Sequence, residues 1–286
     1  MPQHDDVQPL THFYDTHELN EQLILQQLHN HGVSLETLSE DVLKNFDMDH
    51  YDGVEAVDIL ADKAGIQASS SVLDVCCGLG GPSRYLAHLD GFRVMGLDIS
   101  EIRIQSALRF TKMVHLDHLV TFRLGNALEM PFADDTFDVV IGQEAWVHVP
   151  DKPRLFTECR RVLHVGGMMA FTDFLRGDTL LPEELARWQH HWGGYAMPET
   201  CESYGQVLAK TGFTPLEHED LGAQWAAIVA QRVARLRALR DSMVTHHGED
   251  VYRRREATRQ FMSEMFAAGK ICGGRFIARL DAKARG

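Results

Sequence analysis

Two groups of residues have the types and spacing to bind a nucleotide-like ligand. Residues 72–80 read Val-Leu-Asp-Val-Cys-Cys-Gly-Leu-Gly, an apolar strand pattern that runs into a glycine turn. Because glycine lacks a Cβ, Gly78 and Gly80 let a ligand approach the backbone closely. Asp98 ends a second apolar pattern about 20 residues further on, where an acid accepts hydrogen bonds from ribose hydroxyls. The two groups predict a site for an adenosine-containing molecule, and the alternative is a strand–turn–helix without a ligand.

The turn also indicates which molecule of this kind fits. Nicotinamide enzymes favour G-x-G-x-x-G, which covers a pyrophosphate. Here the pattern is D-x-x-x-G-x-G, with Asp74 at the end of the strand. A carboxylate repels a pyrophosphate but attracts an ammonium group. S-adenosylmethionine carries an α-amino group and no phosphate, so the pattern favours it over NAD and places Asp74 near its amino end, directly or through water.

Alternating strand and helix patterns surround this turn. Strands are expected at 71–75, 92–97, 119–124, 137–142 and 167–173, and helices at 81–89, 100–113 and 152–163. Such alternation predicts a parallel sheet with helices on both faces, whose carboxyl ends meet at one ligand-binding edge.

The flanking segments have a different pattern. Residues 9–45 read as helices separated at Gly32, residues 46–53 as a polar loop with aromatic members, and residues 54–66 as another helix. After Asp173 the patterns predict helix over 182–211, a strand at 213–219, a long helical region over 223–268 with one break near Gly248, and a last strand at 274–280.

Composition limits the class of protein. The 286 residues are 44% hydrophobic and 24% charged, and the formal net charge is −13. An acidic protein repels phosphate backbones, so nucleic acid is not the expected partner. The N-terminus lacks the pattern of a signal peptide, no apolar run reaches the roughly 18 residues of a membrane span, and five cysteines form no disulfide framework. We expect a cytoplasmic protein with no membrane partner.

Five sequence blocks resemble the class I S-adenosylmethionine-dependent methyltransferases of small molecules. They begin at Val72, Gly96, Gly125 (Gly-Asn-Ala-Leu-Glu-Met-Pro-Phe), Phe137 (Phe-Asp-Val-Val-Ile-Gly-Gln-Glu-Ala) and Arg161 (Arg-Val-Leu-His-Val-Gly-Gly). The resemblance covers about 70–173 and is strongest to sarcosine/dimethylglycine, phosphoethanolamine and related natural-product methyltransferases. Phe13-Tyr14-Asp15, the 49–53 loop and the 208–213 segment are similar to that group too.

The resemblance implies the cofactor contacts. Asn126 and Ala127 would contact adenine, Ile99 would pack on the adenine face, and Gln143 would line the methionine and substrate side. Tyr14 looks like the N-terminal tyrosine that closes over the cofactor in relatives. Cys76 stands where many relatives carry glycine, and a small cysteine fits there if φ is negative. The implied cofactor-binding set is Tyr14, Asp74, Cys76, Gly78, Gly80, Asp98, Ile99, Asn126, Ala127 and Gln143.

The resemblance also implies an α/β fold. It is a seven-stranded, mostly parallel, doubly wound sheet of the Rossmann-like methyltransferase type, with an N-terminal helical lid and a C-terminal helical insertion. The expected divisions are a lid over 1–66, a cofactor-binding core over 67–175, and over 176–286 a substrate cap with the final strands.

Three residues are candidates for the chemistry. His148 follows Gln143 by about one helical turn, where relatives often carry a histidine, and its roles would be substrate orientation or proton acceptance; the alternative is a loop anchor. His50 and Tyr51 lie in the loop that would cover the pocket, as substrate contacts or as lid packing. An amine or carbon acceptor needs no strong base, whereas a hydroxyl acceptor does.

Other candidates have plain structural alternatives. Trp146, beside Glu144, would offer a cation–π face to a methylated ammonium or form a packed wall. Trp188, Trp192 and Tyr195 would form a cage or core. The His190-His191 and His246-His247 pairs point in different directions on a helix, so we expect no metal site.

We therefore expect methyl transfer from S-adenosylmethionine to a small-molecule acceptor, with an amine nitrogen favoured by the resemblance. Two alternatives stay open. One is methylation of a carbon of an isoprenoid diphosphate or quinone precursor, for which Arg187 and residues 253–255 would meet phosphates. The other is a non-catalytic sensor of S-adenosylmethionine or S-adenosylhomocysteine. The helices over 223–268 suit either a homodimer face or a cap on their own domain.

Overall fold

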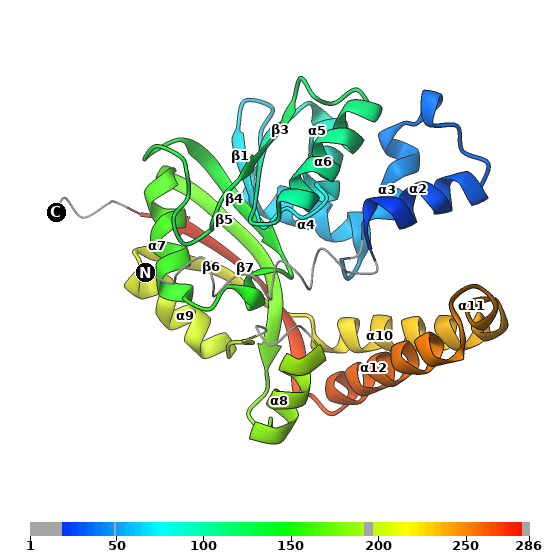
Figure 1. The fold of residues 1–286 in the computed structure, drawn as a ribbon. Coiled ribbons are helices and arrows are strands. Elements are labelled where there is room, and N and C mark those ends of the chain that lie inside the picture. Colours follow the sequence, from blue (N-terminus) through cyan, green and yellow to red (C-terminus); the bar gives the residue numbers. More distant parts are fainter. Residues whose placement is uncertain (1–18, 49, 192–196, 282–286) are drawn as a thin grey trace.

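The centre of the molecule is one sheet flanked by helices (Figure 1). The computed structural model describes residues 19–48, 50–191 and 197–281. In this part of the chain the sheet has seven strands in the order β3-β2-β1-β4-β5-β7-β6, and only β7 runs antiparallel to its neighbours. The strands are β1 (Ser71–Val75), β2 (Arg93–Asp98), β3 (Val120–Leu124), β4 (Phe137–Gln143), β5 (Leu163–Arg176), β6 (Phe213–Asp220) and β7 (Ile271–Leu280). The expected seven-stranded, mostly parallel sheet is confirmed.

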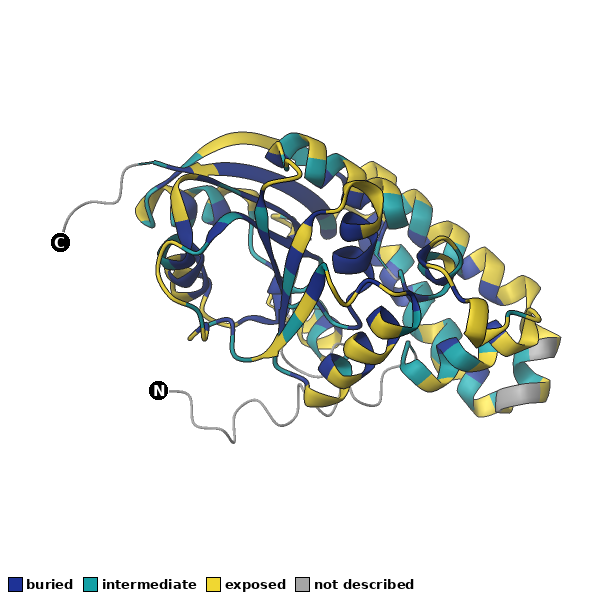
Figure 2. Cartoon of the chain, turned by 90° about the horizontal axis from the view of Figure 1, so that it is seen from above, coloured by how far each residue is buried: buried dark blue, intermediate teal, exposed yellow. Residues whose placement is uncertain are grey.

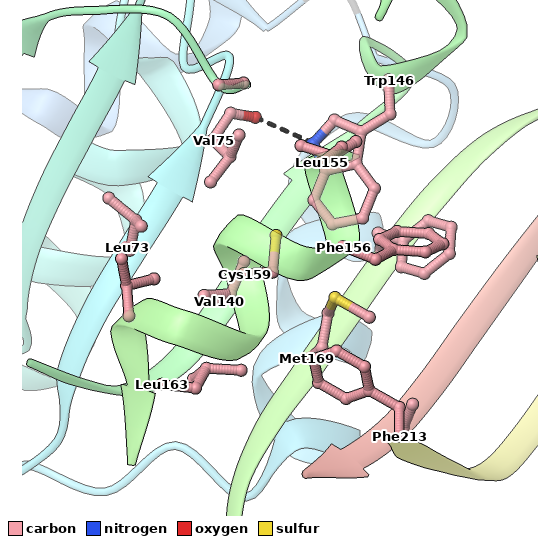
Figure 3. Packing of buried hydrophobic residues seen from close by; sticks show 14 of the residues in the cluster. Leu73, Val75, Val140, Trp146, Leu155, Phe156, Cys159, Leu163, Met169 and Phe213 are labelled. Carbon is pink, nitrogen blue, oxygen red and sulfur yellow. Dashed lines mark hydrogen bonds between the residues drawn. The ribbon is translucent and has the colours of Figure 1, made fainter. Parts of the chain in front are cut away.

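Successive residues of a strand point to opposite faces, and each face has its own hydrophobic core. Leu73 and Val140 pack beneath α7 (Lys152–Val162) and α9 (Cys201–Lys210), in the cluster drawn in Figure 3. Val72 and Val139 pack on the other side, beneath α4 (Gly53–Ala64), α5 (Gly81–Asp90) and α6 (Glu101–Met113). Figure 2 shows buried residues along the strands and exposed residues on the outer sides of the helices.

The N-terminal helices belong to the second of these cores. They are α2 (Glu21–Asn30), the short helix η2 (Leu35–Thr37) and α3 (Glu40–Asp47). Val57 and Leu60 of α4 share a buried cluster with Val139 and Ala170 of the sheet. The core therefore crosses the lid boundary expected at residue 66, and the division into three parts stays a prediction.

The cap is smaller than the expected insertion. α8 (Pro182–His191) follows β5, and α10 (Gly222–Ala238), α11 (Arg240–His247) and α12 (Glu249–Ala267) lie between β6 and β7. α10 and α12 pack side by side and project from the carboxyl edge of the sheet (Figure 1). By contrast, Tyr204 and Leu208 of α9 pack into the sheet core, so α9 is not a cap helix. The helical region has a second break, at Leu239, besides the one near Gly248. No described helix is long and apolar enough to cross a membrane.

Candidate active site

The glycine turn follows β1 in a run of left-handed backbone. Cys76, Gly78 and Gly80 have φ values of +67°, +56° and +75°. The condition of a negative φ at Cys76 is not met, and the reason lies in the backbone hydrogen bonds. The N–H groups of Cys76 and Cys77 both donate to the Leu97 carbonyl oxygen, at 2.7 and 3.0 Å, which turns the chain sharply toward β2. These bonds offset a strain of about 1–2 kcal/mol at a left-handed cysteine.

Gly80 is required by packing as well as by its backbone conformation. A Cβ at this position would lie 2.5 Å from Cζ of Phe122 and 3.1 Å from Nη1 of Arg84. At Gly78 the nearest atom to such a Cβ would be Nη1 of Arg103, at 3.2 Å. The turn is therefore held against β3 and the side chain of Arg103.

Asp98 is fixed by the turn that it faces. One carboxylate oxygen accepts a hydrogen bond from the Gly78 N–H at 2.9 Å, and the other accepts from the Ser100 N–H at 2.9 Å. Burial raises the pKa of Asp98, while these N–H groups and the nearby Arg103 act in the opposite direction. A carboxylate has about four lone-pair sites, so each oxygen keeps capacity for a further donor such as a ribose hydroxyl.

Asp74 is a buried acid close to Asp98. Its carboxylate accepts a hydrogen bond from the Ser83 hydroxyl at 2.6 Å. Burial raises the pKa of Asp74 to about 7, the Ser83 hydrogen bond opposes this, and the charge of Asp98 adds to it. An ammonium group beside Asp74 would favour its ionised form.

Sequence reasoning missed a buried charge cluster beneath the turn. The guanidinium of Arg84 donates to the Leu79 carbonyl oxygen at 2.7 Å and pairs with Asp47, while its Nε lies 3.3 Å from Oε2 of Glu40. All three charged side chains are buried, and burial raises the pKa of Glu40 to about 8. The available signal was the spacing of Glu40 and Asp47, two helical turns apart on one face of α3. The cluster joins α3 to the glycine turn.

The third strand brings Asn126 and Ala127 to the same edge of the sheet. The Gly125 N–H donates to the Asp98 carbonyl oxygen at 2.9 Å, which places the residues after β3 beside the end of β2. The side-chain oxygen of Asn126 accepts from the Leu128 N–H at 2.9 Å, leaving the amide nitrogen for a ligand contact. Ala127 is buried and Ile99 is half-buried.

Gln143 ends β4 with a buried amide. Its side chain is 5% exposed, and neither amide atom has a hydrogen-bond partner among the described residues. A buried polar group without a partner destabilises the fold unless a ligand or water satisfies it. Gln143 therefore fits a contact with a bound molecule at this edge.

The short helix η3 (Trp146–His148) is anchored in the core. The Trp146 indole N–H donates to the Val75 carbonyl oxygen at 3.2 Å (Figure 3), and its ring stacks on Phe171 with centroids 4.5 Å apart. Trp146 is fully buried, which supports the packed-wall alternative over a cation–π face for a ligand. The carboxylate of Asp173 accepts from the Val147 N–H at 3.1 Å, and His148, which follows, is 3% exposed.

The loop at residues 50–53 joins the end of β4 to the cap. The Tyr51 N–H donates to the Glu144 carboxylate, with N–O distances of 3.0 and 3.1 Å. The Tyr51 ring stacks on Trp225 with centroids 4.6 Å apart, and the Arg232 guanidinium lies 4.7 Å from its centroid. Arg232 also donates to the His50 carbonyl oxygen at 3.2 Å. This packing supports the lid interpretation of Tyr51 and His50, and their catalytic roles stay predictions.

Arg187 and Arg253 contact other residues of the cap helices. The Arg187 guanidinium lies 4.3 Å from the Phe261 ring centroid, and Arg253 pairs with Glu249 at 2.9 Å. Trp188 is buried and its ring packs against Phe174, which supports the core alternative over a cage. Tyr14, Trp192 and Tyr195 lie outside the described residues. Within the described ranges, no group of three histidine, cysteine or acidic side chains has an arrangement suited to a metal ion.

The structure thus brings most of the expected residues to one edge. Asp74, Gly78, Asp98, Asn126 and Gln143 all lie at the carboxyl ends of β1 to β4, at the point where the strand order reverses. Ligands bind at such a switch point in open α/β sheets. This arrangement fits S-adenosylmethionine. Asp74 suits an ammonium group, Asp98 suits a ribose, and the glycine turn lacks the pattern that binds a pyrophosphate.

Comparisons with known proteins agree with this site. Residues 73–171 match the family model of the methyltransferase domain. A sterol 24-C-methyltransferase of Gibberella zeae is 34% identical over 169 residues, 57% of this chain and 44% of that protein. Phosphoethanolamine N-methyltransferase 1 of Zea mays is 28% identical over 200 residues, 70% of this chain and 39% of that protein. The chain spans less than half the length of these two relatives.

Solved structures show the same fold. A protein from Galdieria sulphuraria, assigned as a sarcosine dimethylglycine methyltransferase, aligns with a TM-score of 0.73 and 20% identity over 92% of this chain and 99% of that chain. Phosphoethanolamine N-methyltransferase 2 of Haemonchus contortus, in complex with phosphomonomethylethanolamine and S-adenosylhomocysteine, aligns with a TM-score of 0.76 and 20% identity over 96% of this chain and 61% of that chain. Over residues 73–171 the chain is similar to the methyltransferase domain family, and its sheet has the fold of the solved methyltransferases.

Proposed function

We propose that the protein transfers a methyl group from S-adenosylmethionine to an amine nitrogen of a small molecule. The observation that carries the cofactor part is the hydrogen bond from the Gly78 N–H to the Asp98 carboxylate, 2.9 Å long. It joins the glycine turn and the acid into one preorganised surface at the switch point of the sheet. The nitrogen acceptor is supported by the N-methyltransferases among the relatives and structural neighbours.

Each residue has a role in this proposal. Asp98 holds the ribose, Asp74 faces the amino group of the methionine part, and Asn126 and Ala127 contact adenine beside Ile99. Cys76, Gly78 and Gly80 form the turn along which the cofactor lies, and Tyr14 closes over it. Gln143 lies between the cofactor and the acceptor, and His148 orients the acceptor or accepts its proton, with His50 and Tyr51 in the covering loop.

The chain contributes to catalysis mainly by alignment. S-adenosylmethionine supplies a methyl group on a positively charged sulfur, which a nucleophile displaces in line. The rigid turn and Asp98 fix one end of that line, and the buried amide of Gln143 helps to fix the other. In this proposal the cap helices α8, α10 and α12, which lie on the carboxyl side of the sheet, help to exclude water from the reaction. A neutral amine needs no strong base, so His148 has only to receive the proton that leaves afterwards.

The decisive experiment measures S-adenosylhomocysteine release from S-adenosylmethionine across a panel of amines, amino acids, phenols and isoprenyl diphosphates, with and without magnesium. We expect release with an amine or amino acid and no magnesium requirement. Asp98→Asn is the inactive comparison and Asp90→Asn, an exposed acid at the end of α5, is the matched control. Absence of cofactor binding to the wild-type protein would overturn the proposal.

Methylation of an alkene carbon is the second candidate. The sterol 24-C-methyltransferase relative favours it, and so does the aromatic cluster of Tyr51, Phe174 and Trp225 at the carboxyl edge. Aromatic faces stabilise a cation, such as the carbocation left when an alkene carbon accepts a methyl group. Magnesium-dependent release with an isoprenyl diphosphate would support this candidate against the amine. Cofactor binding without release under any condition would instead support the sensor.

A further inference from the structure

A row of polar side chains crosses four neighbouring strands of the sheet, β4, β5, β7 and β6. In the register of the sheet, Gln143 of β4 pairs with Thr172 of β5, and Thr172 pairs with Arg275 of β7. Arg275 pairs in turn with Glu219 on the edge strand β6. Residues directly opposite one another on neighbouring strands project to the same face of a sheet. The four side chains therefore form one continuous row, named here the polar row (Gln143, Thr172, Arg275 and Glu219).

The polar row lies between two apolar layers on this face. Two residues further from the carboxyl edge, Ile141, Ala170 and Ile277 form part of the hydrophobic core beneath α4. Two residues nearer that edge, Phe174 pairs with Gly273. A Cβ at Gly273 would lie 2.3 Å from Cδ2 of Trp225, so the indole covers the strand there.

Three members of the polar row are buried and have polar side-chain atoms without hydrogen-bond partners in the described part of the chain. Gln143, Thr172 and Arg275 are 5%, 1% and 3% exposed. Both amide atoms of Gln143, the hydroxyl oxygen of Thr172 and Nε of Arg275 have no hydrogen-bond partner in the described part of the chain. Nη1 of Arg275 pairs with Glu219, whose side chain is 42% exposed at the outer end of the row. Buried polar groups are almost always satisfied by protein, water or ligand, so these atoms have hydrogen-bonding capacity that a bound molecule can use.

The position of the row assigns it to the acceptor. β7 is the third strand from β1 in the sheet. At about 4.8 Å per strand, Arg275 on β7 lies roughly 14 Å across the sheet from β1, the strand that leads into the glycine turn. Gln143 is the member nearest β1 and lies on the strand next to it. The row therefore runs from the predicted methyl-transfer point across β5 and β7 toward the edge strand β6.

We propose that Thr172 and Arg275 bind an anionic oxygen group, a carboxylate or a phosphate, on the molecule that accepts the methyl group. The inference rests on the proposed methyl transfer and adds the class of acceptor: an amine that also carries an anionic group. The Thr172 hydroxyl and the Arg275 Nε–H donate to the anion, and Glu219 keeps the guanidinium in place from the other side. Gln143, at the cofactor end of the row, contacts the part of the acceptor that reacts.

The test compares amines that differ only in the anionic group. Full-length protein saturated with S-adenosylhomocysteine is titrated calorimetrically with glycine and methylamine, and with phosphoethanolamine and ethanolamine. We expect at least one anionic amine to bind tenfold or more tightly than its neutral counterpart. The two pairs distinguish a carboxylate from a phosphate.

Two variants locate that preference. Thr172→Val keeps the shape of the side chain and removes the hydroxyl, and Arg275→Lys keeps the charge and removes Nε. We expect each to reduce the preference at least fivefold while the Kd of S-adenosylhomocysteine changes less than twofold. Thr121→Val, an exposed threonine on β3, is the matched control and should change neither. Circular dichroism checks that each variant is folded. If Arg275→Lys fails to fold, the isosteric Thr172→Val still tests the inference.

Four results would overturn the inference. They are equal binding of anionic and neutral amines, no binding of either anionic amine, a preference that survives in both variants, and a loss of S-adenosylhomocysteine affinity in the variants. The last would assign the row to the cofactor. Failure of the wild-type protein to bind S-adenosylhomocysteine is a separate result, because it contradicts the proposed function and not the anion preference.

Discussion

Around β1 and β2 the buried acids that face the cofactor turn are satisfied by the chain itself, whereas around β4, β5 and β7 the buried polar groups are not. Asp98 accepts hydrogen bonds from Gly78 and Ser100, and Asp74 accepts one from Ser83. Gln143 and Thr172 are buried, but their polar atoms have no partner in the described ranges. One half of the candidate site is therefore preorganised, and in our proposal the other half takes its hydrogen bonds from a ligand.

This difference indicates where specificity lies. A preorganised surface binds one constant ligand at little entropic cost, which suits a cofactor shared by a family. A buried polar row that needs a partner discriminates against molecules that cannot supply one. We therefore expect changes near β1 and β2 to affect stability and cofactor affinity, and changes near β5 and β7 to affect the choice of acceptor.

The largest expected effect is at the buried charge cluster beneath the turn. Asp47→Asn leaves the Arg84 guanidinium without its buried counter-charge and should lower the free energy of unfolding by about 3–5 kcal/mol. Glu40→Gln should change it less, because Arg84 donates a hydrogen bond to Asp47, whereas Oε2 of Glu40 lies 3.3 Å from Nε of Arg84 without such a bond. Urea unfolding of both variants measures the difference, and equal destabilisation would show that the two acids contribute equally to the cluster.

A second prediction concerns cofactor affinity. Asp98→Asn replaces two charge-assisted hydrogen bonds from backbone N–H groups and should weaken S-adenosylhomocysteine binding about 100-fold, from a loss of about 3 kcal/mol. Calorimetry measures the Kd, with Asp90→Asn as control. An unchanged affinity would remove Asp98 from the site.

A third prediction uses the titration of Asp74. Its folded-state pKa of about 7 lies above the ordinary 3.8, so the folded protein binds the proton more tightly than the unfolded chain. The stability that Asp74 contributes is therefore present below about pH 4 and is lost as the pH rises through about 7. A cofactor ammonium favours the ionised acid, so affinity should rise roughly tenfold between pH 6 and pH 8.

Asp74→Asn provides the control for this pH dependence. Both the fall in stability and the rise in affinity should flatten in the variant, as thermal unfolding and calorimetry over that pH range would show. A rise in affinity that persists in Asp74→Asn would have to come from another group.

The smallest expected effect is at Tyr51. Its ring is packed on Trp225 beneath Arg232, so Tyr51→Phe keeps the contacts and should change the free energy of unfolding by less than about 0.5 kcal/mol and turnover by less than about twofold. Tyr51→Ala should destabilise the cap through the lost aromatic contacts. A large loss of turnover in Tyr51→Phe with unchanged stability would instead support a role of the hydroxyl in catalysis.

The geometry of the predicted cofactor turn could be read largely from the sequence because it is local. The strand, the glycine turn and Asp98 are read from short periodic patterns, and parallel strands necessarily bring their carboxyl ends together. The left-handed φ of Cys76 was not predictable, because it follows from bonds to Leu97 on the neighbouring strand. The choice between the two alternatives for Trp146 was open for a similar reason, because its burial depends on the space above Gly142.

The sequence alone therefore determined the fold class, the cofactor turn and its acids, since these depend on residue spacing along one stretch of chain. Only the tertiary structure decided which distant residues share a surface. Gln143 and Thr172 lie on consecutive strands, but Arg275 joins them only because β7 inserts antiparallel beside β5. Glu40 and Asp47 likewise gain a function only through contact with Arg84. Contacts across the sheet depend on strand order and register, which are set by packing of the whole chain and not by local periodicity.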